Sequence, residues 1–327
     1  MNERTTIVAT RGLSGAAIGD LARRFDLQVW PDRQAPSPEA LAAFARDCDG
    51  LLCLLTDRID AALFERCPRL RVVSSVSVGV DHVDLDAATA RGIPVGHTPG
   101  VLTETTADLA FALLLAAARR VAEGDRFVRA NAWTPERVWE PDLLLGRDVH
   151  GATIGLVGLG AIGQAMARRA QGFGMRVMAW SRTRRDVPGV EFTSLESLLA
   201  AADFVSVHVA LNAETRGLLG PAALARMRPG AVLVNTARGG IVDEEALAEA
   251  LRSGHLHAAG LDVFAQEPLD VASPLRALPN VVLTPHIGSA SEATRARMVA
   301  LAVQNLLAAL AGKRMPHCAN PAVYANA

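Results

Sequence analysis

The fold is decided by the stretch Thr153-Ile154-Gly155-Leu156-Val157-Gly158-Leu159-Gly160-Ala161-Ile162-Gly163. Its apolar run predicts a buried strand, and the alanine-rich run Ala161–Phe173 predicts a helix. Between them the glycines follow the pattern G-x-G-x-x-G, which permits a tight turn, close approach of the backbone to a pyrophosphate and close packing of strand on helix. The free N–H groups at the start of the helix would then face the phosphate.

A glycine turn with a purely structural role is the alternative interpretation of this stretch. The context favours dinucleotide binding, because a strand precedes the glycines, a helix follows them, and a second strand is predicted over Arg176–Trp180 at the expected distance. The residues predicted to line the cofactor here are Gly158, Leu159, Gly160, Ala161, Ile162 and Gly163.

Short apolar runs alternate with helical runs along the whole chain of 327 residues. The other expected strands are Thr6–Ala9, Leu27–Trp30, Gly50–Leu55, Arg71–Ser77, Asp203–Val209, Ala231–Thr236, Ala258–Val263 and Asn280–Leu283. Such alternation is typical of parallel sheets covered by helices on both faces. We expect an α/β fold of two doubly wound, Rossmann-like αβα domains with an interdomain cleft. Residues 101–286 would form the NAD(P)-binding domain, and residues 1–100, completed by 287–327, the substrate-binding domain.

Composition excludes several classes of function. The net charge is −1, so no global field attracts nucleic acid or an anionic membrane. The longest apolar run, Leu109–Ala118, is shorter than the roughly 20 residues of a membrane-spanning helix, and no secretory signal is visible. The four cysteines form no C-x-x-C pair and have no metal-ligand spacing, so we expect no metal and buried thiols in a cytoplasmic protein.

The residues after the strand Arg176–Trp180 bear on the choice of cofactor. NAD-binding domains usually place Asp or Glu there to bind the adenosine ribose. Here Ser181, Arg182 and Thr183 follow the strand, and no acid occurs before Asp186. These side chains would bind a 2′-phosphate that an acid would repel. The pattern therefore favours NADP (NADPH), with NAD possible, over the alternative of a solvated basic loop.

Three polar residues follow expected strands in the second half of the chain: Arg238, Glu267 and His286. Ligands of open α/β sheets bind outside the carboxyl ends of the strands, so we expect the three to share one site. Arginine binds a carboxylate through its planar fork, histidine exchanges a proton near neutral pH, and a neighbouring glutamate favours imidazolium. Taken singly, they could be a turn cap, a surface acid and a loop histidine.

These residues lie in stretches that resemble the D-isomer-specific 2-hydroxyacid dehydrogenase family. The matching stretches are 155–163, 234–243 (Val-Asn-Thr-Ala-Arg-Gly-Gly-Ile-Val-Asp), 260–264 with 267–269, and 284–288 (Thr-Pro-His-Ile-Gly). The resemblance implies that Arg238, Glu267 and His286 are the catalytic set. It also implies that Asp262 contacts the nicotinamide carboxamide, and that Thr106, Thr236, Ala237 and Gly288 contact the cofactor.

Within the family, the stretches 52–57, 75–82 and 97–107 are most similar to the glyoxylate/hydroxypyruvate reductases of animals. This resemblance implies a substrate site formed by Leu55, Ser77, Val78 and Gly79 together with Arg238 and His286. Backbone N–H groups around Val78 and Gly79 would hold the substrate carboxylate, as a glycine at a strand end permits. We expect Asp81 and His82 to be structural, bonded within the loop.

The resemblance implies NADPH-dependent reduction of glyoxylate or hydroxypyruvate to the D-2-hydroxy acid. One alternative is an NAD-dependent enzyme of the same chemistry, such as phosphoglycerate or D-lactate dehydrogenase. A second, from another class, is a nucleotide-sensing corepressor that binds the cofactor without turnover. The absence of a long additional regulatory domain and the Ser181-Arg182 pair count against the first, and the short tail after Pro316 counts against the second.

The segment between the two domains carries the expectations about assembly. Thr103–Ala122 is predicted to be one long apolar helix, with Arg119 and Arg120 in its last turns, where basic residues suit a helix C-terminus. The later segment Asn131–Asp148 is predicted to be an irregular arm. The resemblance implies a homodimer built through this region, in which Trp139 of the arm would reach the partner's substrate site. The alternative is that Trp139 caps its own domain. In the animal pattern another tryptophan follows the Trp-x-Pro group, whereas Trp139-Glu140-Pro141 is followed by aspartate here, which weakens any transfer of substrate preference.

Overall fold

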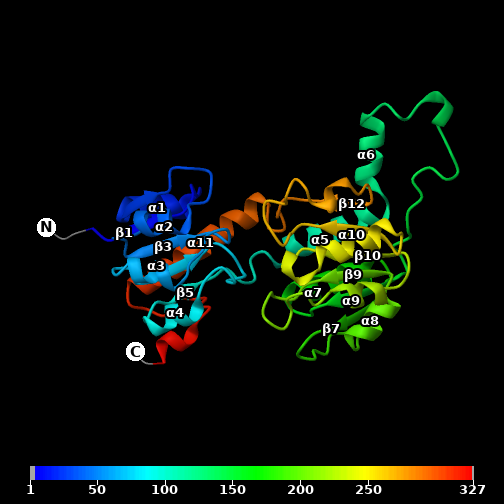
Figure 1. Cartoon of the computed structure of the whole chain (residues 1–327). Coiled ribbons are helices and arrows are strands. Elements are labelled where there is room, and N and C mark those ends of the chain that lie inside the picture. Colours follow the sequence, from blue (N-terminus) through cyan, green and yellow to red (C-terminus); the bar gives the residue numbers. More distant parts are fainter. Residues whose placement is uncertain (1–3, 326–327) are drawn as a thin grey trace. The chain divides into compact units, whose positions relative to one another are not determined.

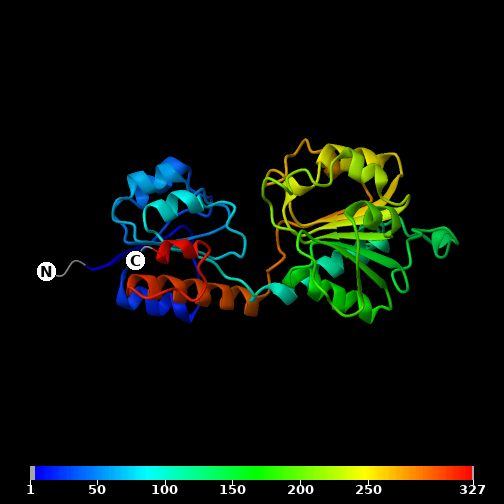
Figure 2. The same ribbon diagram turned by 90° about the horizontal axis from the view of Figure 1, so that it is seen from below.

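The computed structural model describes residues 4–325, which fold into two compact units (Figures 1 and 2). Of the described residues, the first unit contains 4–102 and 290–325. The second unit is the continuous segment Thr103–Ser289. Each unit contains its own parallel sheet with helices on both faces.

The sheet of the first unit has five strands in the order β2-β1-β3-β4-β5, all parallel. The strands are β1 (Thr6–Ala9), β2 (Asp26–Val29), β3 (Gly50–Cys53), β4 (Val72–Ser75) and β5 (Val95–Gly96). The helices are α1 (Ala16–Arg24), α2 (Pro38–Phe44), α3 (Ala61–Arg66), α4 (Leu85–Ala90), α11 (Glu292–Leu310) and the 3₁₀ turn η4 (Pro321–Tyr324). Figure 2 shows α11, in orange and red, along one face of this sheet, where its buried residues pack on β3 and β4.

The sheet of the second unit has seven parallel strands in the order β12-β11-β10-β9-β6-β7-β8. The strands are β6 (Thr153–Val157), β7 (Arg176–Trp180), β8 (Val190–Phe192), β9 (Phe204–Val207), β10 (Ala231–Asn235), β11 (Leu256–Leu261) and β12 (Val281–Leu283). The chain winds outward from β6 to β8 and then returns to β9 on the other side of β6. The order therefore reverses between β6 and β9, the place where open α/β sheets bind their ligands.

Helices cover both faces of this second sheet. They are α5 (Thr103–Ala118), α6 (Val121–Arg129), α7 (Ala161–Gly172), α8 (Leu195–Ala201), α9 (Pro221–Arg226) and α10 (Glu244–Arg252), with 3₁₀ turns η1 (Pro135–Arg137), η2 (Gly239–Ile241) and η3 (Pro274–Ala277). The strands β9 and β10 are buried at every position, as strands covered on both faces should be. Gly155 of β6 is needed at this depth, because an added Cβ would lie 2.3 Å from Leu198 of α8.

The predicted fold class is confirmed, since both sheets are parallel and doubly wound. Strands β1 and β7 have the expected bounds, β2 and β11 begin and end one or two residues earlier than expected, and the other expected strands are shorter. Two short strands, β5 and β8, were not expected from the sequence. The prediction of one helix over Thr103–Ala122 is wrong. Helix α5 ends at Ala118, and Arg120 has a left-handed φ of 52°, which turns the chain before α6 begins at Val121.

The apolar character of α5 has an explanation within its own unit. Its buried side chains, among them Phe111, Leu113 and Leu114, belong to the core that lies against β6, β10 and α7. In the segment 131–148 that follows α6, the regular structure is the short turn η1. Figure 1 shows α6 and this arm projecting away from the rest of the second unit.

The described residues also bear on the expectations drawn from composition. No helix within residues 4–325 is long and apolar enough to cross a membrane. Cys48, Cys53 and Cys67 are buried and Cys318 is partly buried, all as free thiols. Burial raises the pKa of Cys48 to about 12 and also raises the pKa values of Cys53 and Cys67, so these thiols are held in the unreactive protonated form.

Candidate active site

The loop between β6 and α7 has the geometry that a bound pyrophosphate requires. Gly158 has a left-handed φ of 109°, and a Cβ there would lie 2.6 Å from the His208 carbonyl carbon. A Cβ on Gly163 would lie 2.1 Å from the Gly158 carbonyl oxygen, so helix and strand are in close contact. A Cβ on Gly160 would meet no atom within 4 Å. Two glycines are thus required for packing, whereas the third keeps the space above the loop open.

Two features at the carboxyl edge of this sheet fit a dinucleotide. Gly160 is the N-cap residue of α7 and offers no side-chain cap, which leaves the first N–H groups of the helix for an anion. The hydroxyl of Thr236, after β10, is buried and has no hydrogen-bond partner among residues 4–325. A buried hydroxyl without a partner costs free energy unless a ligand satisfies it. Both observations fit the predicted roles of the glycine loop and Thr236, and the predicted cofactor contact of the neighbouring Ala237 stays a prediction.

At the end of β7, the three residues predicted to select the cofactor form an exposed turn. The Ser181 hydroxyl donates to the Thr183 carbonyl at 2.7 Å. Arg182 pairs with Glu214 at 3.0 Å, and the two side chains are 75% and 68% exposed. Such an exposed ion pair contributes little to stability, so a ligand phosphate would compete for Arg182 easily. Glu214 was not predicted to belong to this site, because it lies in the loop after β9, far from Arg182 in the sequence.

His208, which follows β9, was also not predicted as part of this site. Its backbone lies against Gly158, and its Nε2 is 2.9 Å from the Ser206 hydroxyl. Burial lowers the pKa of His208 to about 4, so the imidazole beside the glycine loop is uncharged at neutral pH. A signal was available in the sequence, since His208 follows an apolar strand and ligands of open α/β sheets bind at the carboxyl ends of the strands.

His286 and Glu267 form a hydrogen-bonded pair. Their Nδ1 and Oε2 atoms are 2.7 Å apart, with the side chains 23% and 28% exposed. The Phe264 N–H donates to the other oxygen, Oε1, at 3.1 Å. Burial raises the pKa of Glu267, but these hydrogen bonds and the nearby charges of His286 and Arg238 lower it, and the net shift is downward. Glu267 is therefore an anion that fixes Nδ1 and leaves Nε2 of His286 for a ligand.

Arg238 is held by the turn after β10. The Asn235 side chain donates to the Arg238 carbonyl at 2.9 Å and accepts from the Ala237 N–H at 3.0 Å. A Cβ on the next residue, Gly239, would lie 1.8 Å from the Phe264 carbonyl carbon, so this turn packs directly on the turn after β11. The position of Arg238 relative to Glu267 thus depends on Asn235 and Gly239, neither of which we had singled out.

Asp262 anchors the loop that carries His286. It is fully buried and accepts hydrogen bonds from the Thr284 hydroxyl at 2.6 Å and from the N–H groups of Ile287 and Gly288, each at 2.8 Å. Burial raises its pKa, while these hydrogen bonds oppose the rise. His286 has a left-handed φ of 54°, so its backbone is held by this network. The structure therefore gives Asp262 a positioning role, and its predicted contact with a carboxamide stays a prediction.

Gly288 also lies beside Thr106 of α5, since an added Cβ would be 3.5 Å from the Thr106 methyl carbon. Two of the predicted cofactor residues from distant parts of the sequence are thus neighbours in the second unit.

The catalytic candidates come from three consecutive strands of one sheet, because β10, β11 and β12 are adjacent in the order given above.

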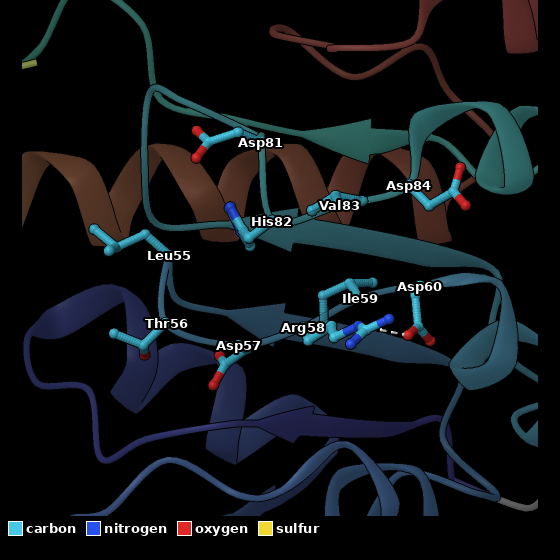
Figure 3. A pocket seen from close by; sticks show the side chains of 10 residues that line it. All are labelled: Leu55, Thr56, Asp57, Arg58, Ile59, Asp60, Asp81, His82, Val83 and Asp84. Atoms are coloured by element: carbon cyan, nitrogen blue, oxygen red, sulfur yellow. Dashed lines mark ion pairs between the residues drawn. The ribbon is translucent and has the colours of Figure 1, made fainter. Parts of the chain in front are cut away.

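The remaining substrate candidates lie elsewhere. Ser77, Val78 and Gly79 follow β4 of the first unit, and Leu55 follows β3. Figure 3 shows Leu55 and His82 on the border of a pocket of about 460 Å³ between the loops after β3 and β4. Trp139 is on the arm of the second unit and is 80% exposed. The role of these five residues toward a substrate stays a prediction.

Fold and loop geometry define a dinucleotide-binding α/β protein. Residues 111–288 match the family described as D-isomer specific 2-hydroxyacid dehydrogenase, NAD binding domain. The chain belongs to this family, as the resemblance of its motifs predicted. It is therefore related to oxidoreductases that use a nicotinamide dinucleotide, in agreement with the site geometry.

The relatives match over nearly the full length. A glyoxylate reductase of Korarchaeum cryptofilum is 48% identical over 321 residues, which cover 97% of this chain and 96% of the relative. A solved Thermus thermophilus protein is 52% identical with a TM-score of 0.90, covering 96% of this chain and 100% of that one. An NADPH-dependent glyoxylate/hydroxypyruvate reductase of Sinorhizobium meliloti, solved in complex with NADP and malonate, is 34% identical with a TM-score of 0.87 and 97% coverage of both chains.

The glycine geometry predicts that alanine substitutions at Gly160 and Gly163 have different effects, the first on cofactor affinity and the second on thermal stability. Gly160→Ala adds a methyl group into open space, so the melting temperature should stay near that of the wild type, while the Kd for NADPH rises about tenfold or more. Gly163→Ala is the matched control, because its methyl group collides with the Gly158 carbonyl and should lower the melting temperature. Fluorescence titration and calorimetry measure both. Wild-type cofactor affinity in Gly160→Ala would contradict the assignment of this loop.

Proposed function

We propose that the protein reduces glyoxylate, hydroxypyruvate and similar small 2-oxo acids to the corresponding D-2-hydroxy acids with NADPH. The observation that carries the proposal is the His286–Glu267 pair, with Arg238 acting on it electrostatically, at the carboxyl ends of β10, β11 and β12. Relatives with the names given above, at 34% to 48% identity, support this substrate class.

In this proposal the residues of the chain divide the work of binding and proton transfer. When bound, the nicotinamide cofactor supplies the hydride that adds to C2 of the 2-oxo acid. Arg238 binds the substrate carboxylate and polarises the keto oxygen, together with the N–H groups around Val78 and Gly79. His286 gives the proton from its Nε2 to that oxygen as negative charge develops on it, and Glu267 accepts the hydrogen bond from Nδ1.

The direct test is NADPH oxidation followed at 340 nm with a panel of 2-oxo acids that includes glyoxylate, hydroxypyruvate, pyruvate and phenylpyruvate. We expect the first two to be the best substrates. His286→Ala should lose about 10²-fold or more in kcat and keep its affinity for NADPH. A protein that binds NADPH but oxidises it with none of these acids would instead support the nucleotide-sensing class of function.

The His286–Glu267 pair predicts the direction in which pH profiles move. Reduction needs protonated His286, and the Glu267 carboxylate stabilises that form. Glu267→Gln keeps the shape and removes the negative charge that stabilises the imidazolium. The alkaline limb of the reduction profile should then move to lower pH. The acidic limb of the oxidation profile, which needs neutral His286, should move the same way. Superimposable profiles of variant and wild type in both directions would refute this relay.

The preference for NADPH is a further part of the proposal. Support comes from the absence of an acid at the end of β7 and from the weak, exposed pairing of Arg182 with Glu214. The Sinorhizobium meliloti relative is named as NADPH-dependent. Removing the guanidinium would therefore remove a partner of the 2′-phosphate and leave NADH unaffected.

We expect wild-type kcat/KM to be at least about tenfold higher with NADPH than with NADH, the size of one charge-assisted contact. Arg182→Ala should raise the KM for NADPH and spare that for NADH. The matched control is Arg184→Ala, since Arg184 is a similarly exposed arginine of the same loop that pairs with Asp186. Equal efficiency with both cofactors, or a preference for NADH, would show that the NAD-dependent alternative is right.

We also infer that the protein is a homodimer in the cytoplasm, built through α6 and the arm. Ten large hydrophobic side chains of the described residues are exposed, and six of them lie between residues 121 and 145: Val121, Val128, Trp133, Val138, Trp139 and Leu145. An exposed apolar cluster of this kind marks an association surface. The apolar residues of α5, which first suggested a dimer, are instead used within their own unit.

Sedimentation at micromolar concentration should therefore give a dimer. Val138→Asp together with Leu145→Asp should shift the protein to monomers, because charges would be buried at the interface. Val271→Asp is the matched control, as Val271 is 86% exposed but lies outside the arm. A wild-type protein that sediments as a stable monomer would refute the dimer and with it the proposed role of Trp139 at the partner's site.

A further inference from the structure

The loop after β4 presents three successive peptide groups in a fixed orientation. The Ser77 carbonyl accepts from the Thr98 N–H at 2.8 Å, the Val78 carbonyl accepts from His97 Nδ1 at 3.0 Å, and the Gly79 carbonyl accepts from the Ser77 hydroxyl at 2.7 Å. In a trans peptide the N–H points opposite to the carbonyl. The three bonds therefore fix the directions of the N–H groups of Val78, Gly79 and Val80, each opposite to the carbonyl that is anchored.

These N–H groups are left for a ligand. Among residues 4–325 we find no protein acceptor for the N–H of Val78, Gly79 or Val80. The peptide between Val78 and Gly79 is the middle one of the three. Its anchor is the side chain of His97, which lies outside the loop. His97 follows β5, so two neighbouring strands of the first sheet meet at this point.

The donor in this contact must be the imidazole, because a carbonyl oxygen only accepts. Nδ1 of His97 therefore carries a hydrogen. The backbone of His97 is fixed in turn from the C-terminal part of the chain. Asn305 of α11, which is fully buried, donates to the His97 carbonyl at 2.9 Å and accepts from the His317 N–H at 3.0 Å.

The close approach of Asn305 depends on Gly96, where a Cβ would lie 2.9 Å from the Cβ of Asn305. A side chain at residue 96 would push α11 away from β5 and release His97. Helix α11 thus does more than complete the core of the first unit. Through Asn305 it holds His97, the residue that anchors the middle one of the three peptides.

The third anchor is held by a directed chain of hydroxyl groups. The Ser77 hydroxyl uses its hydrogen on the Gly79 carbonyl, so it accepts from the Ser75 hydroxyl 2.7 Å away. Ser75 in turn accepts from His82 Nε2 at 3.0 Å. Such a chain polarises each bond in turn and fixes the peptide that follows Gly79. It leaves the orientation of the Gly79 N–H, in the preceding peptide, to His97.

We propose that His97 is a positioning residue for substrate, which turns the Gly79 N–H toward the substrate carboxylate through its bond to the Val78 carbonyl. The inference rests on the proposed function for the identity of that carboxylate. It assigns a part in substrate binding to a side chain that acts through a backbone peptide. It also makes substrate affinity depend on α11, through the bond of Asn305 to His97. Loss of the bond would let the peptide rotate and weaken carboxylate binding without removing any catalytic group.

Four variants separate the effect of losing the hydrogen bond from the effect of changing the size of the side chain. His97→Leu removes the donor, and His97→Phe does so while keeping a ring of similar size. His97→Asn places an amide N–H where Nδ1 stood and should preserve the bond. The control is His255→Leu, because His255 makes a similar contact, 3.2 Å from the Leu224 carbonyl, far from any candidate site in the second unit.

We expect His97→Leu and His97→Phe to raise the KM for glyoxylate about tenfold, with kcat and the KM for NADPH within about threefold of the wild type. His97→Asn should restore the KM, and His255→Leu should change only the melting temperature. A wild-type KM in the leucine and phenylalanine variants would overturn the proposal, as would an asparagine variant as impaired as they are.

Equilibrium binding of malonate, measured by calorimetry on the same full-length proteins, makes the test independent of turnover. The Kd for malonate should follow the same order, with the leucine and phenylalanine variants weakest and the asparagine variant near the wild type. If the wild type reduces no 2-oxo acid but the malonate order holds, the proposed function fails and the role of His97 stands. If the wild type is an active reductase and the malonate order is flat, the role of His97 fails alone.

Discussion

The parallel pairing of β10 with β11 and of β11 with β12 is the constraint on which the candidate active site depends. Parallel neighbours end at the same edge of a sheet, so the residues that follow them are brought together whatever their distance in sequence. Arg238, Glu267 and His286 each follow one of these strands. A seven-stranded sheet with a buried core on both faces fixes the strands, and the strands fix the spacing of the three side chains.

Close backbone contacts then refine what the strands position. Gly239 lies against the Phe264–Ala265 peptide, and Asn235 closes the turn that presents Arg238. Asp262 does the same for the loop of His286, at the free-energy cost of a fully buried carboxylate that is offset by three hydrogen bonds. The chemistry proposed for Glu267 and His286 therefore depends on residues that would never touch a substrate.

The first unit follows the same design with backbone groups instead of side chains. The groups that we propose for binding the substrate carboxylate are N–H groups of the loop after β4, and a loop by itself does not fix the orientation of such groups. The side chains of His97, which follows β5, and of Ser77, in the loop itself, supply that orientation, and Asn305 of α11 holds His97 in place. This dependence gives a physical reason for the C-terminal helix to return to the first unit after the chain has completed the second.

The amino-acid sequence by itself determined the fold class, the glycine loop and the family, because these are encoded locally. An apolar strand, three glycines at fixed spacing and a following helix need no distant partner to be recognised. The identity of Arg238, Glu267 and His286 as candidates also came from local position, since each follows an apolar strand. Only the tertiary structure decided that β10, β11 and β12 are neighbours, and that Nδ1 of His286 meets Glu267. It also decided that Glu214 faces Arg182, that α5 is buried in its own unit and that His97 anchors Val78. Each of these facts depends on strand order or on contacts between residues far apart in the chain, and hydrophobic periodicity contains no information about such pairings.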